Sequence, residues 1–177
     1  MPTIRIAVAV ASFALLASCG GGGGVLSSWK ATDACALLDK GKVAQVMGQA
    51  VAETKLEPVV EDAGNGVSFS NCTYTMADGR MVSLMARNST DAVHTPDEIA
   101  STKKQLADMS PQRFEDVAGL GKTAYWSTGL KQLNVYLDEH RWLIFTFTFA
   151  GSGPMHSQGS SDELKAKAVA LARAGGF

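Results

Sequence analysis

The sequence predicts an α+β domain built on a largely antiparallel, twisted sheet of about six strands with helices packed on it. The strand-like segments are short, and turn residues such as Gly64-Asn65-Gly66 and Asp78-Gly79 separate them. Segments with helix start and stop signals alternate with groups of these strands in the order α-βββ-α-βββ-α. Because tight turns join successive strands, we expect them to pair antiparallel.

The first half is predicted to contain one short helix followed by three strands. Asp39 can cap the helix, and Gly48 supplies the left-handed residue that ends it. The strands are expected over residues 51–60, over residues 67–76 and around Val82, Leu84 and Ala86, where apolar residues alternate.

The second half repeats this pattern. A capping box of Thr95 and Glu98 starts a helix that Pro111 ends, and a second box of Ser160 and Glu163 starts a final helix. Three strands are expected between these helices, over residues 123–127, 132–137 and 141–149. The last of them has apolar residues on both faces, so it is predicted to be a central strand covered at least partly on both sides.

The first 18 residues are typical of an export signal. Arg5 is their only charge, and the uncharged run over residues 6–16 is too short for a membrane span of roughly 20 residues. Leu16-Ala17-Ser18-Cys19 resembles the lipobox of bacterial lipoproteins, in which the cysteine becomes the lipidated mature N-terminus. The alternatives are an ordinary secretory signal with a chance cysteine, or a buried N-terminal strand.

Residues 1–18 are therefore predicted to be a lipoprotein signal peptide, residues 19–31 a lipidated, Gly-rich tether and residues 32–177 a single domain. Lipid on Cys19 would hold the protein on a membrane, because two or more acyl chains give stable anchoring. The 12 residues after Cys19 are expected to reach about 19 Å. Trp29 lies among them and can sit at the lipid headgroups or pack on the domain.

Cys35 and Cys72 are the two cysteines that remain when Cys19 is lipidated. An exported protein folds in an oxidising compartment, so a Cys35–Cys72 disulfide is expected. Two free buried thiols or a metal-binding pair are the alternatives, although neither cysteine lies in a CxxC motif or near a histidine. The sequence predicts no metal site.

The charge balance disfavours nucleic acid as a partner. Removal of Arg5 with the signal lowers the 16 basic residues to 15, against 17 acidic ones. Nucleic-acid binding depends on clustered Lys and Arg, and Lys103-Lys104 is the only adjacent basic pair.

No catalytic motif is complete in this chain. Residues 119–124 partly match dinucleotide-binding and P-loop patterns, but strand-like residues follow them, so a glycine turn is the better interpretation. Residues 101–104 match Ser-x-x-Lys without its companion motifs. We therefore predict no enzyme activity and no cofactor, with His94, His140 and His156 expected to be solvated. A hydrolase built from paired carboxylates is an alternative that no motif supports.

Four aromatic residues of the second half are the candidate binding residues. Tyr125, Trp126, Tyr136 and Trp142 lie in strands predicted to be neighbours, where they can form an exposed platform for a partner or an apolar ligand. The alternative is that they fill the space between the sheet and a helix.

Several short motifs occur together in an order known from one family. They are Cys35-Ala36-Leu37-Leu38, residues 43–48, Cys72-Thr73-Tyr74, residues 117–121 and Ala124-Tyr125-Trp126. Over most of residues 32–174 the chain resembles small secreted lipoproteins of uncharacterised function that are abundant in actinobacteria. The resemblance implies a lipid-anchored α+β domain with the Cys35–Cys72 bridge, and it implies no activity.

These observations favour a membrane-anchored, extracytoplasmic lipoprotein whose domain binds a protein or wall component of the cell envelope without catalysis. A carrier of a small apolar ligand or lipid is the alternative, and it predicts a closed cavity lined by Phe145, Phe147, Met81 and Met85. In a cell with two membranes the domain would face the periplasm. Gly20 is then compatible with the outer membrane, because it replaces the aspartate that commonly signals inner-membrane retention.

Overall fold

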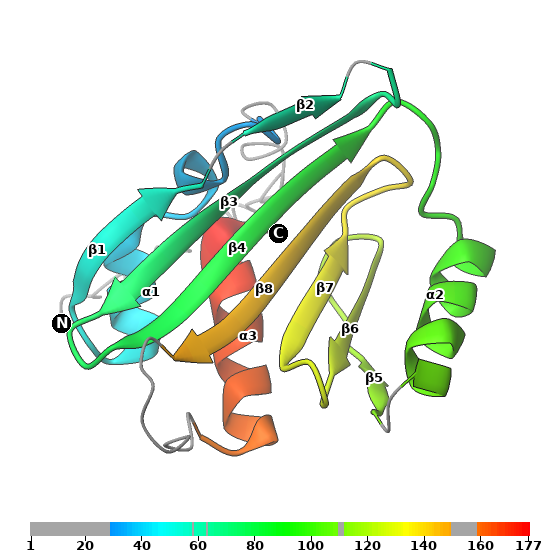
Figure 1. Cartoon of the computed structure of the whole chain (residues 1–177). Helices are drawn as coiled ribbons and strands as arrows, with labels where there is room; N and C mark the ends of the chain where they lie inside the picture. The colour runs from blue at the N-terminus through cyan, green and yellow to red at the C-terminus, as the bar shows by residue number, and fades with distance from the viewer. Residues whose placement is uncertain (1–28, 58, 63, 110–111, 150–158) are drawn as a thin grey trace, which may run out of the picture.

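The computed structural model describes residues 29–57, 59–62, 64–109, 112–149 and 159–177. Within these residues one eight-stranded antiparallel sheet packs against helices, which confirms the predicted α+β class (Figure 1). The helical elements are the 3-10 helix η2 (Ala34–Leu37) and the α-helices α1 (Lys40–Met47), α2 (Pro96–Met109) and α3 (Ser161–Gly175).

The strands lie in the sheet in an order that differs from their order along the chain. From one edge to the other the order is β1-β3-β4-β8-β7-β6-β5, and β2 pairs with the far end of β3. The strands are β1 (Val51–Leu56), β2 (Val60–Asp62), β3 (Val67–Met76), β4 (Arg80–Ser89), β5 (Phe114–Asp116), β6 (Thr123–Ser127), β7 (Gln132–Tyr136) and β8 (Arg141–Phe149).

The predicted strand count and the order α-βββ-α-βββ-α are wrong at two points. The strand expected over residues 51–60 is divided into β1 and β2, and the division falls at Pro58, a residue type with no N–H for a ladder. The additional strand β5 was not predicted, because its three residues are too few to display an alternating pattern.

The pairing of β4 with β8 joins the two halves of the chain into one sheet. It extends over nine residue pairs, from Arg80 opposite Phe149 to Asn88 opposite Arg141. In Figure 1 these two long strands cross the middle of the molecule. The sheet therefore consists of two meanders fused through their last strands, and β8 is central, as predicted.

One face of the sheet forms the main core with α1 and α3, which lie behind the strands in Figure 1. On this face the apolar residues of each strand alternate with residues of the opposite face. Its fully buried residues include Leu84, Leu133, Val135, Leu143 and Phe145 from the sheet and Val43, Leu164, Ala168 and Leu171 from the helices.

The helix ends follow the capping signals in the sequence. The Asp39 carboxylate accepts hydrogen bonds from the N–H groups of Gly41 and Lys42, and Gly48 ends α1 with a φ of +67°. Ser160 and Glu163 form the predicted capping box of α3. Since these bonds satisfy otherwise unpaired N–H groups, they fix where each helix begins.

The domain begins earlier than the predicted boundary at residue 32. Trp29 packs against the main core, and Ala31 is buried. The buried Ser70 hydroxyl donates to the Ala31 carbonyl (2.7 Å) and accepts from the Ala34 N–H (2.9 Å). Residues 29–31 are therefore part of the folded domain, and the tether proposed from the sequence is shorter by these residues.

The structure contains the Cys35–Cys72 disulfide, as expected from the cysteine count. It connects η2 to the middle of β3, and the Tyr74 hydroxyl donates to the Leu38 carbonyl two positions further along that strand. Cys72 and Tyr74 are almost completely buried. A covalent bond and a buried hydrogen bond thus hold the N-terminal helices on the sheet.

The signal peptide, Cys19, most of the tether and Pro111 lie outside the described residues. Within the described residues, no helix combines the length and the apolar character needed to cross a membrane.

Reduction of the disulfide is expected to lower the free energy of unfolding by about 4 kcal/mol, the chain-entropy value for a loop of roughly 38 residues. Urea unfolding with and without a reductant measures this difference. The double variant Cys35→Ala, Cys72→Ala is the control, because the reductant should leave its unfolding midpoint unchanged. An unchanged midpoint for the wild type would contradict the expectation.

Candidate functional site

The second face of the sheet is covered at one end only. There α2 packs on β6 and β7, and its Ile99 side chain is buried against Tyr125 and Tyr136. Figure 1 shows α2 beside the β5–β7 end of the sheet, away from β1, β3 and β4. No described helix covers the strands β3, β4 and β8 on this side, and we call their side chains here the open face.

The strand register arranges the open face in rows. One row contains Asn71, Met85 and Ile144, and the next contains Thr73, Ser83 and Thr146. All six side chains are half-buried, although they belong to central parts of long strands. Apolar side chains therefore alternate with hydroxyls and amides on a surface that remains accessible.

A row of large side chains crosses the end of the open face, and we call it the aromatic row. Phe69 of β3 is opposite Arg87 of β4, Arg87 is opposite Trp142 of β8, and Trp142 is opposite Tyr136 of β7. The Trp142 and Tyr136 rings are stacked, with centroids 5.4 Å apart and an interplanar angle of 8°. The row thus runs from the accessible part of the sheet to the part beneath α2.

Arg87 is the unusual member of the aromatic row. Its guanidinium carbon lies 6.0 Å from the centre of the Trp142 ring. No carboxylate among the described residues forms an ion pair with it, and its buried Nε has no hydrogen-bond partner among them. A half-buried guanidinium that lacks an acid is a favourable binding group for acceptor oxygens, because each unmet hydrogen bond costs free energy.

His94 borders the aromatic row from the loop that precedes α2. The centroid of its ring lies 5.1 Å from the centroid of the Tyr136 ring and 5.3 Å from that of the Trp142 ring. Its backbone N–H donates to the Glu139 carbonyl. Burial lowers the pKa of His94 below its ordinary value, and the positive charge of Arg87 acts in the same direction. The expectation that His94 is solvated is therefore wrong, because the loop folds back over the row.

The nitrogen His94 Nε2 and the indole nitrogen Trp142 Nε1 are also buried without a hydrogen-bond partner among the described residues. With Arg87 Nε, three such atoms belong to neighbouring side chains. Buried polar atoms normally have hydrogen-bond partners. Three nitrogens without a described partner, on neighbouring side chains, therefore distinguish the aromatic row from an ordinary packed core.

The four aromatic residues predicted to bind do not form one exposed platform. Trp126 is completely buried on the other face of the sheet, where its indole N–H donates to the Ser161 hydroxyl (3.0 Å). Tyr125 and Tyr136 are buried beneath α2, and burial raises the pKa of both phenols. Trp142 is half-buried in the aromatic row. Consecutive residues of a strand point to opposite faces, which separates Trp126 from the other three.

The cavity predicted for an apolar carrier is not formed by the four residues named for it. Phe145 and Phe147 point into the main core, whereas Met81 and Met85 point to the opposite face. The sheet therefore lies between the two pairs.

The paired carboxylates serve mostly structural purposes. Glu115 pairs with Lys165 and Asp116 with Lys103, each at 2.7 Å. Other acids from adjacent acidic pairs also have defined partners: Asp62 with Asn65, Asp138 with Arg141, Glu139 with Lys122 and Glu163 with Ser160. Within the described residues no three His, Cys, Asp or Glu side chains are grouped as a metal site would require.

The glycine turn predicted at residues 119–124 is present. Gly119 and Gly121 have φ angles of +76° and +51°, and strand β6 follows them directly. A Cβ on Gly121 would lie 2.5 Å from the Tyr136 carbonyl oxygen. The turn therefore requires glycine at this position, which agrees with the sequence interpretation.

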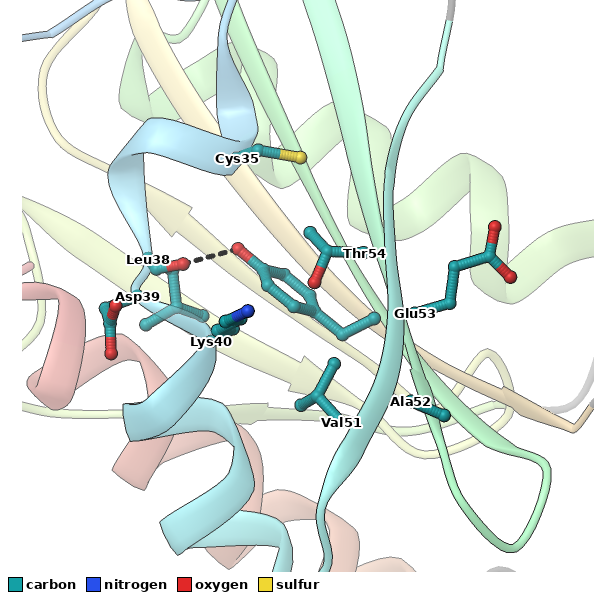
Figure 2. A pocket seen from close by; sticks show the side chains of 9 residues that line it. Cys35, Leu38, Asp39, Lys40, Val51, Ala52, Glu53 and Thr54 are labelled. Carbon is teal, nitrogen blue, oxygen red and sulfur yellow. Dashed lines mark hydrogen bonds between the residues drawn. The ribbon is translucent and has the colours of Figure 1, made fainter.

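A separate groove of about 420 Å³ lies between β1 and the η2–α1 segment. Figure 2 shows Val51 and Thr54 on the groove side of β1 and Glu53 pointing away from it. Tyr74 of β3 also lines the groove, and its hydroxyl donates to the Leu38 carbonyl. The other lining residues are Cys35, Asp39, Lys40 and Ala52.

Comparisons with protein-family models, with curated proteins and with solved structures give no match to this chain. The candidate sites are therefore defined by the geometry of the described residues alone.

Phe69, Arg87 and His94 are not among the binding residues predicted from the sequence. Arg87 and Trp142 are 55 residues apart in the sequence and become neighbours only through the pairing of β4 with β8. One signal was available: Arg87 follows the alternating residues Val82, Leu84 and Ala86 and falls on the opposite face from them.

The lowered pKa of His94 predicts a loss of stability in mild acid. The unfolded chain takes up the His94 proton as the pH falls through about 6.5, before the folded chain does, so the free energy of unfolding decreases there. The decrease is complete below the pKa of the folded state. Urea unfolding from about pH 8 to about pH 5 measures it.

The variant His94→Gln should lose this part of the pH dependence, while the part due to carboxylates remains. Equal slopes for the variant and the wild type between about pH 7 and pH 5 would contradict the assignment to His94.

Proposed function

We propose that this protein is a lipid-anchored, non-catalytic binding protein of the cell envelope that recognises a protein or wall component through the open face of its sheet. The observation that carries the proposal is the half-covered second face. A sheet of this size can bury both faces, yet β3, β4 and β8 present accessible Met85, Ile144 and Thr146 side chains there. Exposed surfaces of mixed apolar and polar character are typical of interaction sites.

Arg87 defines the chemistry expected of the ligand. Its guanidinium has no acid among the described residues and lies between the aromatic side chains of Phe69 and Trp142. Arginine and tryptophan are the residue types most often responsible for binding energy at interfaces. We infer a ligand that presents carboxylate or carbonyl oxygens beside an apolar group.

The arrangement of the N-terminus agrees with attachment to a membrane. The first described residue, Trp29, packs on the face occupied by α1 and α3, opposite the open face. If lipid is attached at Cys19, the tether reaches the domain on its helical side. The open face is then available to a partner in the envelope.

The two alternatives receive less support. A carrier needs an enclosed apolar cavity, and the residues predicted to line one are divided between the two faces of the sheet. A hydrolase needs acids free to act on a substrate, and most of the candidate carboxylates are held in ion pairs or helix caps.

Photo-crosslinking in cells that produce the full-length protein tests the binding surface. A photoreactive amino acid at Ser83 or Thr146 should give a covalent adduct of defined mass. The same amino acid at Ala166, which is exposed on α3 at the opposite face, is the control. Adducts of equal yield from Ala166, or none from the open face, would refute the proposal.

The substitution Arg87→Ala should reduce the adduct from Thr146 by at least about tenfold, the effect expected when a central arginine of an interface is lost. Arg113→Ala removes an equal charge from an exposed position directly before β5 and should leave the yield unchanged. Urea unfolding of both variants checks that the domain is intact. A yield that falls equally in both would indicate a general charge effect.

The anchor is tested separately by Cys19→Ser. This variant should lose incorporation of labelled fatty acid and should leave the membrane fraction, because the acyl chains supply the binding free energy. Cys35→Ser, which removes a cysteine of the disulfide, should keep the label. Labelling of the Cys19→Ser protein would exclude lipidation at this site.

A further inference from the structure

The two edges of the sheet are protected to different degrees. At one edge β5 has only three residues, and short edge strands resist pairing with another chain. At the other edge β1 has six residues, of which the five from Ala52 to Leu56 are exposed. Leu56, Val59 and Val60 on this side are 41%, 42% and 39% exposed and are large apolar side chains. The edge at β1 is the one available for association.

The register shows which backbone groups of β1 are free. The Glu57 N–H donates to the Asn71 carbonyl (2.8 Å), and Lys55 and Glu53 are opposite Thr73 and Thr75 in the same ladder. Successive residues of an antiparallel strand direct their N–H and C=O groups alternately toward the neighbouring strand and away from it. Thr54 and Leu56 therefore direct their N–H and C=O groups away from β3.

The side chains of β1 are complementary to a second copy of the same strand. If two β1 strands pair antiparallel about a two-fold axis at Thr54, Glu53 of each copy lies opposite Lys55 of the other. These positions form a non-hydrogen-bonded pair, in which the side chains are closest. Two opposite-charge pairs thus form on one face of the joined sheets, in addition to the Lys55–Glu57 ion pair (3.3 Å) within each copy.

An axis at Leu56 is less favourable. It would place Thr54 opposite residue 58, which is a proline and has no N–H to complete the hydrogen bonds. With the axis at Thr54, the N–H and C=O groups of Thr54 in both copies bond to each other. The groove beside Val51 and Thr54 leaves space on the other face for side chains of the second strand (Figure 2).

We propose that two copies of this protein associate through β1, forming one continuous sheet with a two-fold axis at Thr54. The contact is a few residues long, so it is smaller than a standard protein interface and the association is reversible. It leaves the open face of each copy accessible on the same side. The dimer therefore presents two binding surfaces in one plane.

Carbodiimide cross-linking of mixed isotopes tests this arrangement. Full-length protein in detergent is mixed as ¹⁴N and ¹⁵N preparations, and cross-linked peptides are identified by mass. We expect hybrid ¹⁴N–¹⁵N peptides that join Glu53 to Lys55. The exposed Lys122–Glu139 pair is the internal control, because its linkage should join peptides of one isotope only.

The variant Thr54→Pro removes the outward N–H without affecting bonds to β3, since proline is tolerated on edge strands where the N–H faces solvent. It should reduce the hybrid peptides by at least about tenfold, whereas Thr54→Ala should keep them. Glu53→Lys protein mixed with Lys55→Glu protein should again give hybrid peptides, because the charges of this pair are complementary.

Several results would overturn the proposal. They are the absence of hybrid peptides while the Lys122–Glu139 linkage forms, and hybrid peptides that persist in Thr54→Pro. Hybrid peptides that join mainly Lys55 to Glu57 would place the axis at Leu56. A linkage from Lys55 to a different protein would show that the edge binds another partner.

Discussion

The antiparallel pairing of β4 with β8 is the contact on which the rest of the structure depends. These strands come from opposite halves of the chain, and their nine residue pairs hold two meanders in one sheet. The pairing places Leu84 beside Phe145 on one face and Arg87 beside Trp142 on the other. The main core and the aromatic row are therefore produced by the same register, and a shift of one residue would exchange them.

The two faces produced in this way are covered to different extents. The face under α1 and α3 is closed and apolar, and it includes the completely buried Trp126. The other face is covered only at the β6–β7 end, where α2 closes over Tyr125 and Tyr136. Polar atoms without described partners gather where the covered part ends and the open face begins. Stability is concentrated on one side of the sheet, and the proposed recognition takes place on the other.

Local signals made much of the fold predictable from the sequence. Asp39, Gly48 and the Ser160–Glu163 box fixed helix ends, because caps depend on neighbouring residues only. The disulfide followed from a count of cysteines. The crossover from β4 to β8, the short strand β5 and the neighbours of Arg87 were not predictable, since they depend on contacts between residues far apart in the chain. The four candidate aromatic residues could not be assigned to one face for the same reason, since Trp126 and Trp142 look alike in the sequence and differ in the face they occupy.

The position of the disulfide also determines how the domain bears mechanical load. A pull on the N-terminal end would first act on residues 29–34, which are held to the sheet by the Ser70 hydrogen bonds. Once these yield, the force passes through the Cys35–Cys72 bond to the middle of β3, which is paired on both sides. The disulfide then limits the extension of the chain from this end to the few residues before Cys35. A pull on the N-terminus would thus bypass residues 36–71 and act directly on the middle of β3.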